Sequence, residues 1–175
     1  MAPLFSGMLV CACAPFWRQD ALTADQHHRF GVIYEEHGLS DDAINEYRRA
    51  ARLRPDDPEN WMAIGDIQFE RGSYAVAARC FRRALKVAPR HVGALNNLAM
   101  TFLERNKDLG EAERLAQEAL REESPLKPYV LDTLAKIYER EGRLREASAT
   151  AAQAAAAQAA AAPAASRDVT FLPRP

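Results

Sequence analysis

Cysteine is scarce in this sequence. Among the 175 residues there are three, Cys11, Cys13 and Cys80. An odd and small number argues against the disulfide framework of a small secreted scaffold. Cys80 lies within a predicted helix beside the apolar Phe81, so we expect it to be a small packing thiol.

An excess of one charge and long hydrophobic runs are also missing. Lys and Arg together number 23 and Asp and Glu 24, for a formal net charge of −1. This balance gives no bulk electrostatic case for binding nucleic acid. After the N-terminal segment no apolar run reaches the roughly 18 residues that indicate a membrane span. Alternating Val, Ile and Thr segments are absent, so the chain is expected to be all-α.

Motifs for chemistry are lacking as well. The sequence has no glycine-rich phosphate loop, no metal-spaced Cys/His set and no nucleophile motif. Adjacent helical residues face different directions, so His27 and His28 cannot hold one ion together, and we expect a solvated or groove-edge pair. Cys11 and Cys13 have no His or further Cys nearby. We therefore expect a non-enzymatic protein with no catalytic residue, no metal and no cofactor.

What is present is a repeat. Gly65 lies 34 residues after Gly31, and Pro89 lies 34 residues after Pro55. The same spacing relates Ala77 to Ala43 and Phe81 to Tyr47. A period held at independent positions predicts helix–turn–helix units, of which about four fit: 24–57, 58–91, 92–125 and 126–160. The fourth is weaker because no large residue occupies the position of Phe81.

Turn and capping residues separate the predicted helices. Gly38 is expected as a left-handed C-terminal cap, and Asn106 takes the same place in the third unit. Ser40 is expected as the N-cap of the following helix. The Ala-rich last helix is expected to extend to about Ala162, with 161–175 as a disordered tail.

The best-formed unit resembles the tetratricopeptide repeat, whose signature is Trp-x2-Leu-Gly-x2-Tyr, then Ala-x3-Phe, then Ala and Pro. The matching residues are Trp61, Ile64, Gly65, Ala77, Phe81, Ala84 and Pro89, and Gln68 departs from the usual Tyr. The first unit matches from Phe30 to Pro55, although His27 replaces a large apolar residue. The resemblance covers about 24–155 and implies a right-handed α-solenoid, in which small residues such as Gly65 interlock with large ones.

The resemblance also implies a binding groove lined by the first helix of each unit. The groove residues expected from it are His28, Glu35, Glu36, Met62, Asp66, Phe69, Glu70, Asn96, Asn97, Met100, Glu104, Asp132 and Lys136; Leu103, Tyr129 and Thr133 belong to the same helix positions. Acidic side chains predominate, with an apolar strip that includes methionine. This combination fits a protein or peptide partner that is basic and apolar. Carboxylate-clamp tetratricopeptide domains bind the acidic C-terminal tails of chaperones with Lys and Arg at groove positions. At the corresponding positions here, only Asn97 fits the clamp pattern, so an acidic chaperone tail is a disfavoured ligand.

Residues 1–23 differ from the rest. The stretch up to Ala14 is uncharged and apolar, and Val10-Cys11-Ala12-Cys13 resembles the lipobox of a bacterial lipoprotein, with Cys13 as the lipidation candidate. A basic n-region is missing. We expect a lipid-anchored protein of the cell envelope at the outer membrane, facing the periplasm. The alternatives are an apolar leader that packs on the first helix, and a free cytoplasmic protein whose leader results from a mis-set start.

The function expected from these features is that of a scaffold for protein–protein interaction. Its concave groove would bind a peptide or helix in an envelope-assembly or secretion system. The alternatives are a soluble cytoplasmic adaptor, an accessory subunit of an enzyme complex and a self-associating array. No feature fixes the oligomeric state.

Overall fold

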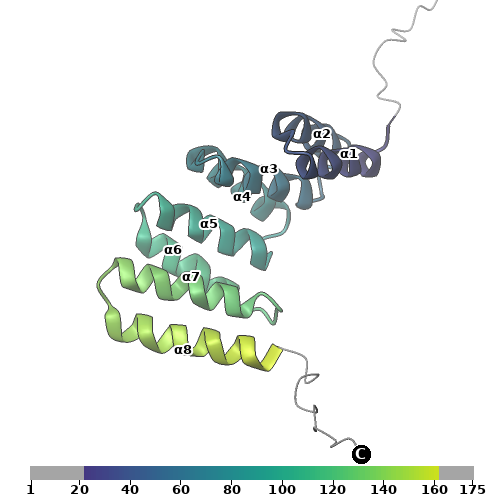
Figure 1. Cartoon of the computed structure of the whole chain (residues 1–175). Coiled ribbons are helices and arrows are strands. Elements are labelled where there is room, and N and C mark those ends of the chain that lie inside the picture. Colours follow the sequence, from purple (N-terminus) through teal and green to yellow (C-terminus); the bar gives the residue numbers. More distant parts are fainter. Residues whose placement is uncertain (1–21, 162–175) are drawn as a thin grey trace, which may run out of the picture.

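The computed structural model describes residues 22–161, and within this range the chain forms eight helices and no strand (Figure 1). The helices are α1 (Ala24–Glu36), α2 (Ser40–Leu53), α3 (Glu59–Glu70), α4 (Tyr74–Val87), α5 (Val92–Glu104), α6 (Leu109–Ala119), α7 (Lys127–Arg140) and α8 (Leu144–Ala161). Each helix packs against the next one in the chain. The pairs stack from α1 and α2 at one end to α7 and α8 at the other. The expected fold class, an all-α solenoid, is confirmed.

Left-handed residues close the turn within every helix pair. Gly38, Gly72 and Gly142 have φ values of 72°, 71° and 76°, and Asn106 has 50°. Residues with a Cβ rarely adopt this conformation, and Asn is one of the few that tolerate it. The predictions for Gly38 and Asn106 are therefore confirmed. Asp108, in the longer third turn, also has a positive φ of 56°.

Capping differs from the expectation at the start of α2. Ser40 is the first helical residue, and the N-cap position belongs to Leu39, which makes no side-chain capping bond. The prediction of Ser40 as N-cap was wrong by one position. The Schellman-like turn before it already supplies the bond from Leu39 N to Tyr34 O at 2.8 Å. A side-chain cap is present on α1, where Thr23 and Gln26 form a capping box.

Small residues on the first helices receive large residues from the second helices. A Cβ on Gly65 would overlap the ring of Phe81, and one on Gly31 would overlap the ring of Tyr47. Phe81 is fully buried and Tyr47 nearly so. The backbones of each pair can therefore approach closely, which is what gives the core its interlocked packing.

The last helix contributes less to the core. The buried residues of α8 are Ala147, Thr150 and Ala154, and none is large. Ala has the best helix propensity, which lets α8 continue to Ala161 although little of it is buried. The terminal pair thus needs no further helix to cover it.

Two side chains lie deeper than expected. His27 was predicted to be solvated or at the groove edge, but it is fully buried, with Nδ1 2.5 Å from Glu46 Oε2. Leu103 was predicted to belong to the apolar strip of the groove, but it is 5 % exposed and packs in the core. Cys80 is buried as predicted.

The predicted leader and tail fall largely outside the described residues. Cys11 and Cys13, with the rest of 1–21, lie outside, and so do 162–175. Among the helices between these limits, none has the length and apolar character needed to cross a membrane.

Candidate functional site

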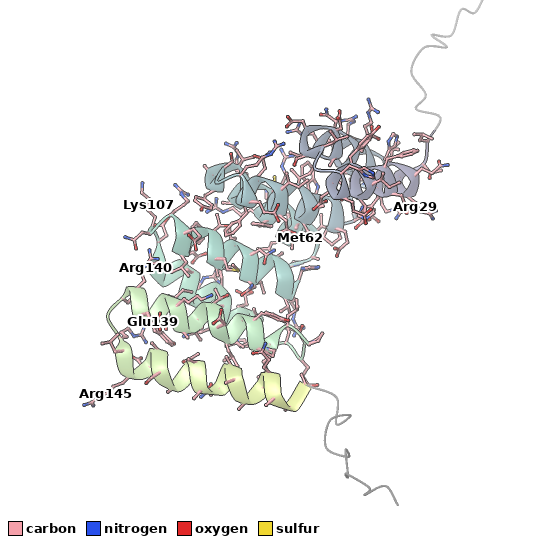
Figure 2. All side chains as sticks on the ribbon, in the orientation of Figure 1. Arg29, Met62, Lys107, Glu139, Arg140 and Arg145 are labelled. Carbon is pink, nitrogen blue, oxygen red and sulfur yellow. The ribbon has the colours of Figure 1, made fainter. Side chains whose placement is uncertain are left out.

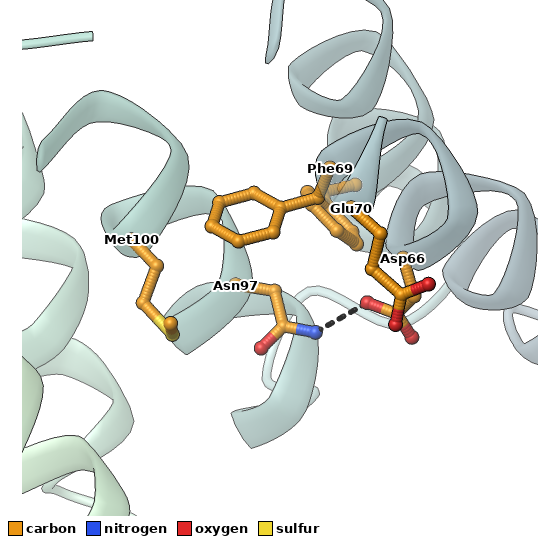
Figure 3. Close-up of a pocket in the computed structure, with 6 residues that line it drawn as sticks. Asp66, Phe69, Glu70, Asn97 and Met100 are labelled. Atoms are coloured by element: carbon orange, nitrogen blue, oxygen red, sulfur yellow. Dashed lines mark hydrogen bonds between the residues drawn. The ribbon is translucent and has the colours of Figure 1, made fainter. Parts of the chain in front are cut away.

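A hollow of about 210 Å³ opens between α3 and α5 (Figure 3). Its lining residues are Asp66, Phe69, Glu70, Phe81, Asn97 and Met100. The α3 residues follow the i, i+3, i+4 spacing of one helix face, and Asn97 and Met100 are three apart on α5. Five of the six were predicted as groove residues, and the sixth, Phe81, was predicted as a core residue and forms the floor.

Asp66 and Asn97 join the two helices at this hollow. Asn97 Nδ2 donates a hydrogen bond to Asp66 Oδ1 over 2.7 Å (Figure 3). Burial raises the pKa of Asp66 to about 6; the hydrogen bond from Asn97 opposes this shift, while the nearby Glu35 and Glu70 add to it. At neutral pH the carboxylate is therefore charged. Within residues 22–161 no cation forms an ion pair with it.

Phe69 and Met100 supply the apolar side of the hollow. The ring of Phe69 packs edge-on against Tyr74, with centroids 5.3 Å apart, and this contact sets its direction. Both side chains are half-buried. Met is flexible and polarisable, so it adapts to ligands of different shape.

A second hollow of about 620 Å³ adjoins the first and extends from α3 across α5 to α7. Its lining residues are Met62, His91, Gly93, Asn96, Asn97, Met100, Leu126, Tyr129, Asp132 and Thr133. Asn97 and Met100 line both hollows. The two together form a continuous depression, which we call the groove.

Asn96 leaves a polar atom unused in the groove. Its side chain is 8 % exposed, and in the described part of the chain its Oδ1 accepts no hydrogen bond. Its Nδ2 lies 3.5 Å from both Asn97 Oδ1 and Met100 Sδ, which are weak contacts. A buried amide oxygen without a donor is costly, and a bound ligand with an N–H or O–H could remove that cost.

The predicted residues at the α1 end lie outside the groove. His28 Nδ1 is 3.0 Å from Asn60 Oδ1, and its ring centroid is 5.4 Å from that of Tyr47. Glu35 accepts a 2.7 Å hydrogen bond from the Tyr47 hydroxyl. Glu36 is exposed and lines neither hollow. His28 therefore joins the first two helix pairs, whereas Glu35 contacts α2 within the first pair.

Two further predicted residues also miss the lining. Glu104 is exposed at the end of α5. Lys136 Nζ lies 2.6 Å from Asp132 Oδ2, so it neutralises one groove carboxylate from the side. Of the thirteen predicted groove residues, Met62, Asn96 and Asp132 therefore line the groove in addition to the five in the α3–α5 hollow. The unpaired carboxylates of the groove lie on α3.

Sequence reasoning missed His91 and Leu126 because both precede the first turn of a helix. His91 caps α5, its Nδ1 accepting a hydrogen bond from Ala94 N over 3.0 Å, and its Nε2 lies 3.1 Å from Glu59 Oε1. Leu126 is exposed just before α7. The sequence feature that could have identified them is their position, because each lies at the start of a first helix, at the mouth of the expected groove.

The groove offers several kinds of binding group. Its polar groups are carboxylates, amides, a histidine and the hydroxyl-bearing Tyr129 and Thr133, with thioethers and aromatic rings between them. No cluster of three or more His, Cys, Asp or Glu suited to a metal ion occurs among residues 22–161. The arrangement can recognise a cationic or hydrogen-bonding ligand that also carries apolar surface.

The solenoid resembles solved structures in its fold. Two crystal structures of MamA align with TM-scores of 0.71 and 0.68 at 18 % and 17 % identity. The first alignment covers 81 % of each chain, and the second covers 86 % of this chain and 79 % of the other. At this identity the likeness concerns the fold.

Relatives of known name share parts of the sequence. Human protein O-mannosyl-transferase TMTC1 is 39 % identical over 69 residues, which is 39 % of this chain and 8 % of that protein. Mouse tetratricopeptide repeat protein 14 is 33 % identical over 97 residues, 55 % of this chain and 13 % of that protein. The matches thus span a small fraction of each relative. The family model described as tetratricopeptide repeat matches 28–78 and 62–128, more than half of the sequence. The chain therefore belongs to the tetratricopeptide repeat family of protein-interaction scaffolds.

Proposed function

We propose that the groove binds a peptide or helix of a protein partner, and that the bound segment is apolar and basic. The observation that carries this proposal is the continuity of the groove. Two hollows share Asn97 and Met100 and together run from α3 across α5 to α7. A depression of this length suits a segment that crosses several helices, as an extended peptide or a helix does.

The chemistry of the lining supports a cationic ligand. Asp66 and Glu70 form no ion pair within the described residues, and both line the α3–α5 hollow. A Lys or Arg of the ligand placed there would gain a charge-assisted hydrogen bond in a partly desolvated site. The apolar side chains of the ligand would contact Phe69, Met100 and Met62, and one of its donors could reach Asn96 Oδ1.

The test uses a defined probe, a fluorescein-labelled amphipathic peptide of Leu and Lys, titrated by fluorescence anisotropy. Glu70→Lys reverses one groove charge at an exposed position and should weaken binding by about tenfold, because a like charge replaces an attractive one. Glu123→Lys makes the same change at an exposed residue outside the groove and should leave the affinity within about twofold.

Equal losses in the two variants would show that the peptide responds to overall charge, and the groove proposal would fail. A second variant, Met100→Ser, keeps the charge and removes apolar contact from the centre of the groove. It should weaken the same peptide while circular dichroism shows an unchanged helix content. Retained affinity in both Glu70→Lys and Met100→Ser would move the site elsewhere.

We also propose that the protein works at a bacterial cell envelope, in an assembly or secretion system, and is tethered by a lipid on Cys13. The support is the sequence Val10-Cys11-Ala12-Cys13, which lies outside the described residues. Cys13→Ser should shift the protein from the membrane to the soluble fraction of its host, with Cys80→Ser as the matched control. If wild type and Cys13→Ser partition alike, the tether is absent, and a soluble adaptor or an accessory subunit of an enzyme complex becomes the better description.

A further inference from the structure

A third hollow, of about 370 Å³, lies on the other side of α3, between α2 and α4. Its lining residues are Arg48, Arg52, Trp61, Ile64, Val76, Arg79, Cys80 and Arg83. Trp61 and Ile64 precede Asp66 and Phe69 by five residues each, which turns them about 140° around the helix from the groove. We call this feature the arginine hollow.

The four arginines form two facing rows without counter-charges. Arg48 and Arg52 are four apart on α2, Arg79 and Arg83 are four apart on α4, and no acidic residue lines the hollow. Helix α4 contains no Asp or Glu at all. Across the described residues, none of the four makes a hydrogen bond or an ion pair.

Several arginines elsewhere among residues 22–161 are paired with carboxylates. Arg114 lies 2.8 Å from both Glu111 and Glu118. Arg143 contacts Glu113 and two further carboxylates. Other described arginines, such as Arg29 and Arg121, are unpaired singly, whereas the arginine hollow brings four arginines together with no carboxylate among its lining residues.

The floor of the hollow is apolar. Ile64 and Cys80 are buried, and Trp61 and Val76 are half-buried. Burial raises the pKa of the Cys80 thiol, while the charges of Arg83, Arg48 and Arg79 oppose this shift, which places these guanidinium groups around the floor. The guanidinium of Arg83 covers the ring of Trp61 at 4.4 Å from its centroid. That ring face is therefore occupied and is not free to stack on a nucleobase.

We propose that the arginine hollow binds an acidic peptide segment of a second protein partner. An aliphatic or aromatic side chain of the segment would enter the apolar floor, and Asp or Glu residues on either side would pair with the two rows of arginine. Guanidinium groups bind carboxylates through two parallel hydrogen bonds, and rows separated across a hollow require a ligand with several anionic groups. A single small anion would reach one row and leave the floor empty.

This site is separate from the groove and has the opposite charge. A chain with both would hold a basic segment on one side of α3 and an acidic segment on the other. The scaffold would then bring two different partners together, and loss of either site would leave the other working.

The probe for this proposal is a short fluorescein-labelled peptide with a central Leu-Phe pair flanked by Asp and Glu. Arg48→Gln with Arg79→Gln removes one charge from each row at exposed positions and should weaken binding by about tenfold, since charge-assisted hydrogen bonds are lost. The control is Arg29→Gln with Arg145→Gln, which changes the net charge equally at opposite ends of the solenoid (Figure 2). The affinity of this control for the acidic probe should stay within about twofold of the wild-type affinity.

Four outcomes would overturn the proposal. Equal weakening by both double variants would mean diffuse charge attraction. Unchanged affinity when the Leu-Phe pair of the probe becomes Ser-Ser would mean that the floor is not used. Displacement of the peptide by equimolar ATP or pyrophosphate would assign the hollow to a phosphate ligand. Affinity for the acidic peptide that rises in Glu70→Lys would instead place that peptide in the groove.

Discussion

The two sides of helix α3 differ in the sign of the charge that they leave unpaired. On the groove side, Asp66 and Glu70 lie next to apolar side chains and no cation. On the other side, Trp61 and Ile64 lie among four guanidinium groups and no carboxylate. One helix therefore separates an acidic from a basic surface, and the separation lies in the best-formed repeat of the chain.

The difference between the two sides of α3 indicates that folding stability does not determine where the unpaired charges lie. Exposed ion pairs contribute little to folding, so a solenoid can leave like charges together at small cost. The same chain pairs Arg114 and Arg143 with glutamates near its C-terminal end. Unpaired charge of one sign on each side of α3 is available to ligands of opposite sign, as electrostatic complementarity requires.

The largest expected effect comes from the residue that sets the spacing between α3 and α4. A Cβ at position 65 would overlap the Phe81 ring, so Gly65→Ala should lower the free energy of unfolding by about 1–3 kcal/mol through overpacking. Urea denaturation measures this change. In Gly110→Ala the new Cβ meets no atom within 4 Å, and this control should gain about 0.5–1 kcal/mol from helix propensity. The same sign for both substitutions would contradict the assigned packing.

Measuring each charge variant against both probe peptides would test whether the two sides of α3 bind independently. Glu70→Lys should weaken the basic probe about tenfold and leave the acidic probe within about twofold, and Arg48→Gln with Arg79→Gln should do the reverse. Anisotropy titrations at equal ionic strength give the four affinities. If either variant weakened both probes alike, the two sides of α3 would not act as separate sites.

A smaller effect is expected at Asp66. Its pKa in the folded protein is raised to about 6 from an ordinary value of 3.8, so the folded state holds the proton more tightly than the unfolded state. The charged carboxylate therefore lowers the free energy of unfolding. This loss is absent at pH values below the ordinary pKa, grows as the pH rises, and is complete above about pH 6. Asp66→Asn should stabilise the fold by about 1 kcal/mol near pH 7.5, less than the full shift implies because the side chain is partly solvated.

Urea denaturation at about pH 4 and pH 7.5 measures this difference. The gain should vanish at the lower pH, where the wild-type carboxyl is protonated in the folded state. Asp132→Asn offers a control at an exposed carboxylate of the same groove. A gain for Asp66→Asn that is equal at both pH values would remove desolvation of the charge as its cause.

The smallest effect is expected at Lys136. This residue pairs with Asp132 four positions earlier at the surface of α7, and both side chains are more than half exposed. Lys136→Ala should change the free energy of unfolding by no more than about 0.5 kcal/mol, because such exposed helix pairs contribute little. It should strengthen the basic probe slightly, since Asp132 loses its partner. Weaker binding would show that Lys136 itself contacts the ligand.

The repeat period was enough to predict the helix pairs. The resemblance to the tetratricopeptide repeat then placed Asp66, Phe69 and Asn97 on the groove face of the first helices. The turn geometry was also predictable, because Gly38 and Asn106 belong to the few residue types that tolerate a positive φ.

Contacts between particular side chains of different helices were not predictable from the register. His27 is buried and contacts Glu46 of α2 within the first pair, and the sequence does not show which side chain lies opposite. The arginine hollow was not predicted, for the same reason. Each row of arginines is visible on its own helix, but the rows become neighbours when α2 and α4 lie on either side of α3.

The opposite charges across α3 also affect how the molecule meets its partners. With a net charge of −1 the chain is nearly neutral, yet the two sides of α3 carry local charges of opposite sign. Such local fields would orient the molecule during diffusional approach, with a basic partner drawn to the groove and an acidic one to the arginine hollow. Orientation of this kind weakens as salt shortens the Debye length. Partner choice by this scaffold would then begin in solution, in the rate of encounter.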